Sequence, residues 1–139
     1  IIGVSVSETT IEIRIATATC AVDCGIVMNP NTVEAQMQGG LIFGWTMALY
    51  GELTYENGAA QQSNFHDYQI MRITETPQID VVIIKSGEAP GGIGEVATTV
   101  AAPALTNAIF AATGVRIREL PIDTKLLVEK GGVQREQPN

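Results

Sequence analysis

Strands are predicted where apolar side chains alternate with polar ones or form a short run. Residues 11–22 begin as isoleucines alternating with charged residues and continue in Thr, Ala and Val, a composition typical of a strand with one buried face. Residues 2–6, 79–84 and 115–120 have a similar character. We therefore predict four strands, with a reversal at residues 8–10 joining the first two along the chain.

A long helix is predicted before Gly51, where small and apolar residues recur at helical spacing. Asn31 or Thr32 is suited to cap its N-terminus, and Glu34 falls in its first turn. Gly51 directly follows its last residue. These are common start and stop signals of a helix.

The alanine-rich segment 96–113 predicts a second long helix, which Pro103 bends and Gly114 ends. Asp123 is suited to cap a last short helix that reaches Lys130. Strands and helices mix without a repeating strand–helix–strand order. We therefore predict an α+β fold.

Composition indicates a globular domain with net negative charge. Of 139 residues, 45% are hydrophobic and 17% charged, and the net charge is −7. We expect one domain over residues 1–130 and a flexible polar tail over 131–139. No nucleic acid or anionic membrane is expected as a partner, because basic residues are scattered singly. The longest apolar candidate, 39–49, is shorter than the ~20 residues that span a bilayer, so no membrane span is expected.

The two cysteines predict neither a disulfide nor a zinc site. On a continuous strand Cys20 and Cys24 would lie about 13 Å apart, which is too far for a disulfide. A C-x3-C pair without further ligands is also a poor zinc signal. We expect both cysteines to be buried structural thiols.

Asn57-Gly58 predicts a hairpin, and the stretch 63–77 after it predicts an irregular loop that can reach a functional site. His66 is the only histidine of the chain. The pair His66-Asp67 therefore lacks the second histidine of a typical metal site, and no metal ligands are predicted.

Small residues form a ridge on the first long helix. Gln36, Gly40, Gly44 and Ala48 recur every four residues, so they share one face. The glycines and Ala48 suit either close packing of a second helix or close approach of a ligand. Gln36 offers both a hydrogen-bond donor and an acceptor, which makes it a candidate for orienting a ligand.

The most informative segment is the glycine-rich turn 87–95 between a predicted strand and a predicted helix. It is a simple turn in the plainest interpretation. Gly91, Gly92 and Gly94 also leave space beside Glu95, which stands at the start of the helix. The helix N-terminus favours an ionised carboxylate, so Glu95 is a candidate general base.

A dinucleotide-binding site is the alternative for this turn. Residues 92–97 fit G-x-G-x-x-A, and the acid Glu119 follows some twenty residues later. However, the carboxylate of Glu95 would repel a pyrophosphate at the helix N-terminus, and residues 85–91 separate the strand from the first glycine. A non-enzymatic interaction fragment is a third possibility.

Six motifs occur together in the chain. Two of them, PGGIGE at 90–95 and APALTNAIF at 102–110, resemble the end of the molybdenum-binding subunit of the xanthine dehydrogenase and aldehyde oxidase family. The others are CAVDCG at 20–25, NP at 29–30, QMQGG at 36–40 and SNFHDY at 63–68, and they resemble in particular the branch that contains the isoquinoline 1-oxidoreductase β-subunit. The joint occurrence and order of the motifs carry the resemblance.

The resemblance implies roles for four residues. Glu95 falls on the catalytic glutamate of the family, a general base that takes a proton as oxygen attacks an electron-poor carbon. Gln36 falls on a glutamine that hydrogen-bonds the molybdopterin, and Gly92 and Gly94 would lie beside the cofactor. Val96 stands where relatives usually carry proline, a departure that affects the start of the helix.

The resemblance also implies a larger enzyme. The complete subunit would hold molybdenum–molybdopterin, expected in a dinucleotide form, and would oxidise an aldehyde or an N-heterocycle. Electrons would leave through iron–sulfur clusters of a partner subunit. The chain begins at Ile1 within a predicted strand, so we expect it to be a piece that needs the remainder of the molybdenum subunit and holds no cofactor alone.

Overall fold

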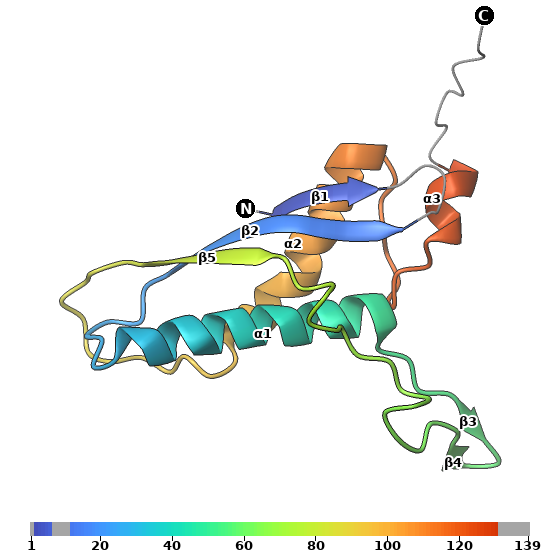
Figure 1. Ribbon diagram of the computed structural model, residues 1–139, viewed down its shortest axis with the longest axis horizontal. Coiled ribbons are helices and arrows are strands. Elements are labelled where there is room, and N and C mark those ends of the chain that lie inside the picture. The colour runs from blue at the N-terminus through green and yellow to red at the C-terminus, as the bar shows by residue number, and fades with distance from the viewer. Residues whose placement is uncertain (1, 7–11, 131–139) are drawn as a thin grey trace, which may run out of the picture.

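The computed structural model describes residues 2–6 and 12–130, which form a small sheet covered on one side by helices (Figure 1). The elements in chain order are β1 (Ile2–Val6), β2 (Ile13–Val22), α1 (Pro30–Tyr50), β3 (Tyr55–Glu56), β4 (Ala59–Ala60), β5 (Gln78–Ile83), α2 (Val96–Thr113) and α3 (Lys125–Lys130). The predicted reversal at 8–10 and tail at 131–139 lie outside the described residues.

The main sheet has the strand order β1-β2-β5. β1 runs antiparallel to β2, whereas β5 runs parallel to it. A parallel pair needs a long crossover, and α1 lies in the connection between β2 and β5. The predicted α+β class is confirmed, with one strand–helix–strand crossover that the sequence analysis did not foresee.

A β-bulge in β2 keeps its apolar side chains on the core face. Ile15 and Ala18 are both buried, although residues three apart on a regular strand point to opposite faces. The pairing with β1 shifts between Gly3 and Val4, so Ala16 is the extra residue of the bulge. The extra residue shifts the alternation of side chains by one, so the side chains before and after it lie on the same core face.

The N-cap of α1 lies two or three residues before the predicted position. Asn29, and neither Asn31 nor Thr32, is the N-cap, because its side-chain oxygen accepts a hydrogen bond of 3.3 Å from the backbone N–H of Thr32. Pro30 takes the first helical position, where its missing N–H costs little. Glu34 consequently lies beyond the first turn.

The predicted ends of the two long helices are confirmed. The N–H of Gly51 donates to the carbonyl of Met47 over 3.1 Å at the end of α1. Gly114 ends α2 with a left-handed φ of 73° and donates to the carbonyl of Phe110. Pro103 lies inside α2, as expected.

α1 and α2 cross in close contact along the ridge of small residues. A Cβ atom on Gly40 would lie 2.9 Å from the Cβ of Ala97, and one on Gly44 would lie 2.5 Å from the Cβ of Ala101. The hydroxyl of Thr98 donates to the carbonyl of Gly40 over 3.2 Å. These two glycines therefore serve helix packing rather than a ligand.

α2 is the central helix of the core. Its inner face consists of Ala97, Ala101, Leu105 and Ile109, each at most 1% exposed, and it packs against α1 and β1. By length and apolar composition α2 is the one helix among the described residues that could span a membrane, a candidate that the sequence analysis overlooked. Only one face of α2 is buried, and Val96, Val100 and Phe110 are 44%, 49% and 38% exposed.

The strand predicted at 115–120 is wrong. Val115 and Ile117 are buried and the arginines between and after them are exposed, so the alternation is real. However, no strand among the described residues pairs with this segment. The short helix after it is confirmed as α3, and the carboxylate of Asp123 accepts from the N–H of Lys125 over 2.9 Å.

The predicted hairpin is confirmed and projects from the body of the molecule (Figure 1). β3 and β4 are joined by Asn57 and Gly58, which both have positive φ, 50° and 82°. This is the backbone conformation that favours an Asn-Gly turn.

The chain returning from the hairpin is anchored on the last turns of α1. The N–H of Met71 donates to the hydroxyl of Thr46 over 3.3 Å, and the hydroxyl of Tyr50 donates to the carboxylate of Glu75. Burial, followed by the hydrogen bond with Glu75, raises the pKa of Tyr50 to about 12. The base of the projecting segment is thus held at two points.

Candidate functional site

The glycine-rich loop connects β5 to α2 and runs along the N-terminal half of α1 (Figure 1). Near the start of α1, Ile26 N–H donates to the carbonyl of Glu88 over 3.0 Å, and Gly91 N–H donates to the carbonyl of Cys24 over 2.9 Å. At the other end of the loop α2 crosses α1 at Gly40. The loop is therefore held on both sides of residues 92–95, by the segment before α1 on one side and by α1 itself on the other.

Glu95 occupies the N-cap position of α2 with an exposed side chain. Its carboxylate makes no capping hydrogen bond to the helix, although a helix N-terminus favours a nearby negative charge. The carboxylate is therefore available to a group outside the chain. Its position at the start of the helix is as predicted.

The described residues give no reason for glycine at positions 92 and 94. Neither Gly92 nor Gly94 has positive φ, and a Cβ atom added to either would meet no atom within 4 Å. At Gly91 a Cβ atom would make only an ordinary contact, 3.7 Å from the carbonyl oxygen of Cys24. The backbone beside Glu95 is thus open to close approach by an external group.

Gln36 lies on α1 one turn before the crossing at Gly40. Residues four apart on a helix are neighbours on its surface, and Glu95 lies two residues before Ala97, which contacts Gly40. The crossing therefore brings Gln36 and Glu95 to the same end of the helix pair. The Gln36 side chain is exposed, and no hydrogen bond from the described residues reaches its amide.

A cluster around Asp23 ties the loop to the segment that precedes α1. One carboxylate oxygen of Asp23 accepts from the hydroxyl of Ser86 over 2.6 Å and from the N–H of Gly25 over 3.1 Å. These two hydrogen bonds, the one from Ser86 first, lower the pKa of Asp23. The sequence analysis gave these residues no role, although an Asp two residues before a Gly signals an Asx turn.

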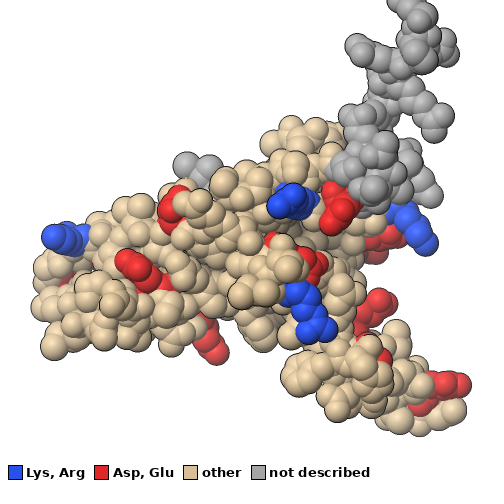
Figure 2. Space-filling model, viewed as in Figure 1, with Lys and Arg blue, Asp and Glu red and all other residues tan. Residues whose placement is uncertain are grey.

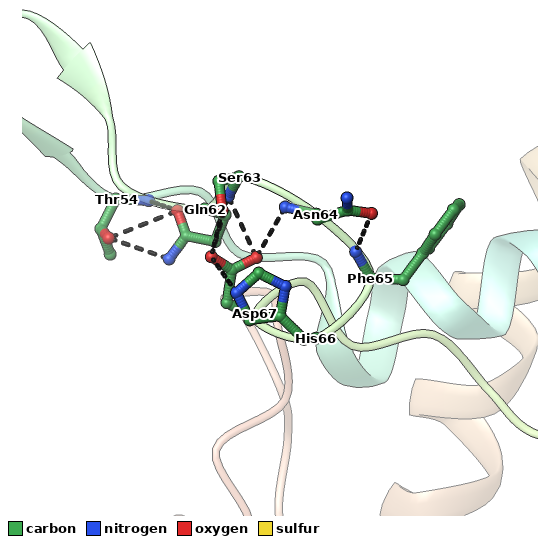
Figure 3. A network of polar contacts seen from close by, with 7 residues as sticks. All are labelled: Thr54, Gln62, Ser63, Asn64, Phe65, His66 and Asp67. Carbon is green, nitrogen blue, oxygen red and sulfur yellow. Dashed lines mark hydrogen bonds and ion pairs between the residues drawn. The ribbon is translucent and has the colours of Figure 1, made fainter.

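Asp67 organises the loop after the hairpin, as Figure 3 shows. Its carboxylate accepts from Asn64 N–H over 2.8 Å, from Ser63 N–H over 2.9 Å and from the Ser63 hydroxyl over 2.9 Å. These backbone hydrogen bonds are the main reason that the pKa of Asp67 falls to about 2. Asp67 therefore stabilises a turn of the loop.

His66 lies 3.5 Å from the carboxylate of Asp67, and its side chain is 74% exposed. Within residues 2–6 and 12–130, no three His, Cys, Asp or Glu side chains gather into a metal site. Cys20 and Cys24 are both free, as expected, with Cys24 buried and Cys20 partly buried. Burial raises the pKa of the Cys20 thiol.

The charged side chains on the face drawn in Figure 2 are dispersed, and the basic ones stand singly. The sequence analysis predicted no nucleic-acid partner because the chain's basic residues are scattered, and phosphate binding needs clustered basic residues.

The dinucleotide alternative does not fit the arrangement of the elements. In that fold the helix after the glycine turn packs beside its own strand and leads to the next parallel strand. Here α2 packs on α1 and β1, and no strand follows it among the described residues. Glu119, the candidate ribose ligand, lies outside any described strand. The dinucleotide interpretation is therefore wrong.

Comparison with known proteins identifies the family. Residues 1–77 match the family described as the molybdopterin cofactor-binding domain. The beta subunit of isoquinoline 1-oxidoreductase from Brevundimonas diminuta is 41% identical over 103 residues, which are 74% of this chain and 13% of the relative. The large subunit of nicotine 6-hydroxylase from Paenarthrobacter nicotinovorans is 31% identical over 127 residues, which cover 84% of this chain and 16% of the relative.

Solved structures share the fold. Quinoline 2-oxidoreductase from Pseudomonas putida 86 superposes with a TM-score of 0.80 and 25% identity, over 97% of this chain and 18% of that protein. Aldehyde oxidoreductase from Desulfovibrio gigas superposes with a TM-score of 0.76 and 26% identity, over 91% of this chain and 14% of that protein. This chain thus spans less than a fifth of each of these proteins. It belongs to the molybdenum-binding family of xanthine dehydrogenase and aldehyde oxidase.

Proposed function

We propose that this chain is the part of a molybdenum hydroxylase subunit that supplies the general base, Glu95, and a pterin contact, Gln36. One observation carries the proposal. An exposed carboxylate without a capping hydrogen bond follows two glycines that neither packing nor backbone conformation explains within the described residues. An external group lying against the loop accounts for the exposed carboxylate, for its missing capping hydrogen bond and for the two glycines.

The residues at this place suit a molybdopterin cofactor. The amide of Gln36 can both donate and accept, which matches the ring nitrogens and carbonyl of a pterin. Gly92 and Gly94 leave room that a side chain would fill. When bound, the cofactor would deliver a water-derived oxygen to the substrate and would accept the two electrons removed from it.

Glu95 would take the proton carried by the oxygen that attacks the substrate carbon. Its exposed position lets it reach an external reacting group, which is the first geometric requirement of general base catalysis.

The relatives support a substrate class and further components for the complete enzyme. Their names include oxidoreductases of isoquinoline, quinoline and aldehydes and a hydroxylase of nicotine, so the substrate is an N-heterocycle or an aldehyde. Two of the relatives are named as subunits. We include in the proposal a dinucleotide form of the cofactor, iron–sulfur clusters on a partner subunit, and the remainder of the molybdenum subunit.

Replacing Glu95 tests the proposed function. In the complete enzyme Glu95→Gln keeps the shape of the side chain but cannot accept a proton, so kcat should fall by about 10²–10⁴-fold, as for a lost general base. Molybdenum and pterin content per subunit should stay close to that of the unmodified enzyme.

Glu119→Gln is the matched control, because it also neutralises an exposed glutamate but lies away from the loop. It should leave kcat unchanged. If Glu95 only compensated the helix dipole, Glu95→Gln would cost no more than ~1 kcal/mol of stability. A Glu95→Gln enzyme with full molybdenum content and an unmodified rate would refute the proposal.

A further inference from the structure

We propose that Asp23, Gly25 and Ser86, here called the loop clamp, position the glycine-rich loop and thereby the carboxylate of Glu95. The inference rests on the proposed role of Glu95 and adds positioning residues that touch neither substrate nor cofactor. The loop clamp lies where the chain leaves β2 and the loop leaves β5.

Side-chain and backbone contacts extend the parallel pair of β2 and β5 beyond the sheet. Ile84 N–H donates to the carbonyl of Val22 over 2.8 Å. Just beyond these residues, Asp23 and Ser86 are joined by the hydrogen bond of 2.6 Å between carboxylate and hydroxyl. The Ile26–Glu88 and Gly91–Cys24 backbone hydrogen bonds continue the contact. The loop is thus held over most of its length up to residue 91.

Gly25 sets how closely the two segments approach. It has a left-handed φ of 72°, which favours glycine. A Cβ atom at this position would lie 2.2 Å from the carbonyl oxygen of Ala89 and 2.7 Å from that of Glu88. These are backbone atoms, so any side chain at position 25 would have to push the loop away.

The geometry of the chain transmits such a displacement to Glu95. Only three residues lie between Gly91, the last residue bonded to the segment before α1, and Glu95. On the far side, α2 is fixed by the contact of Thr98 with Gly40. Only these three residues can absorb a displacement of Gly91 before it reaches Glu95. Moving the clamped part of the loop therefore moves the carboxylate.

Gly25→Ala in the complete enzyme is the first test, with Gly114→Ala as its control. Both glycines have nearly the same positive φ, 72° and 73°, so both substitutions bring similar backbone strain. A Cβ atom at Gly114, however, would meet nothing within 4 Å. We expect Gly25→Ala alone to speed hydrogen exchange of the amides of residues 91–95 and to lower kcat by about 10- to 100-fold.

Asp23→Ala, with Asp23→Asn as the conservative variant, tests the loop clamp without a steric clash. Alanine removes the acceptor of both hydrogen bonds, whereas asparagine keeps an oxygen in the same place. We expect Asp23→Ala to speed hydrogen exchange of the amides of residues 91–95 and to lower kcat, with KM and molybdenum content little changed. In Asp23→Asn, the exchange rate and kcat should return most of the way to those of the unmodified enzyme. Because Asp23 is exposed, Asp23→Ala remains informative even where Gly25→Ala does not fold.

The outcomes separate this inference from the proposed function. If Glu95→Gln is inactive but Asp23→Ala changes neither kcat nor hydrogen exchange of residues 91–95, only the loop clamp is overturned. Full activity of Glu95→Gln would instead overturn the role of Glu95. A loss of kcat in Asp23→Ala that Asp23→Asn does not restore would also contradict the loop clamp, because a retained acceptor oxygen should hold the loop.

Discussion

The glycines of this chain fall into two groups: those that packing within the domain requires, and those that nothing among the described residues requires. Gly40 and Gly44 are required by the helix crossing, since a Cβ atom there would clash with α2. Gly39, Gly92 and Gly94 have neither positive φ nor a neighbour within 4 Å. Gly39 lies in an exposed helix interior, where glycine costs about 1 kcal/mol relative to alanine, whereas Gly92 and Gly94 lie in the loop before α2. Neither packing nor backbone conformation within the described residues explains these three glycines.

Gln36 should bind the cofactor through its side-chain amide. In the complete enzyme Gln36→Leu keeps the approximate size but removes both hydrogen-bonding functions, and it leaves the partner groups unsatisfied at a cost of about 1–3 kcal/mol. We expect molybdenum and pterin content to fall. The measurement is metal analysis together with pterin fluorescence after release.

Gln38→Leu is the control on the same helix. Gln38 is exposed and donates to the carbonyl of Ile79 at the long distance of 3.4 Å, so its loss should leave cofactor content unchanged. Equal content in the Gln36→Leu and unmodified enzymes would show that Gln36 has no part in binding.

At the scale of elements, two glycines of α1 should respond in opposite ways to the same substitution. Gly44→Ala places a Cβ atom 2.5 Å from the Cβ of Ala101 and 2.8 Å from the carbonyl of Thr98, and such overpacking costs about 1–3 kcal/mol. Gly39→Ala meets no atom and should stabilise the chain by up to about 1 kcal/mol through helix propensity. Urea unfolding of the 139-residue chain measures both, and a destabilising Gly39→Ala would contradict the assignment of an open surface.

The loop held by Asp67 should loosen in acid. Hydrogen bonds from Asn64 and Ser63 lower its pKa from 3.8 to about 2. The stabilisation by Asp67 is therefore complete above its unfolded pKa near 3.8 and is lost as the pH falls through about 2. Amide exchange of Ser63 and Asn64, corrected for its intrinsic pH dependence, should show this transition.

His66→Gln is the control for that experiment. The charge of His66 is the smallest contribution to the lowered pKa of Asp67, so the substitution should hardly move the transition. Asp67→Ala should abolish it. Protection that persists unchanged below about pH 2 would show that the Asp67 carboxylate does not hold the loop.

Sequence patterns predicted most elements because their signals are local. The helix 96–113 has alanine throughout and a glycine at its end, and Asn57-Gly58 defines its own turn. The errors arose where the structure of a segment depends on its pairing with a distant segment. Residues 115–120 alternate like a strand but have no partner strand in the described part of the chain. The pairing of β2 with β5 joins strands that residues 23–77 separate.

At the scale of the whole molecule, the candidate site was predictable only in part. The placement of Glu95 at the start of a helix followed from local signals, and its proposed role came from the family resemblance. The bond between Asp23 and Ser86 joins residues 63 positions apart. Nothing in the local sequence around either residue could have predicted it, because it depends on how β2 and β5 pair.

The crossing of α1 and α2 limits how this domain can diverge among relatives. Tightly packed helices do not slide continuously past each other, so the relation between Gln36 and Glu95 is built into the contact of Gly40 and Gly44 with α2. The two helices and the loop between them would have to be inherited as one block. If the proposed function holds, substrate preference would evolve in other parts of the polypeptide, because recombination inside this block would separate the two groups proposed to meet the cofactor.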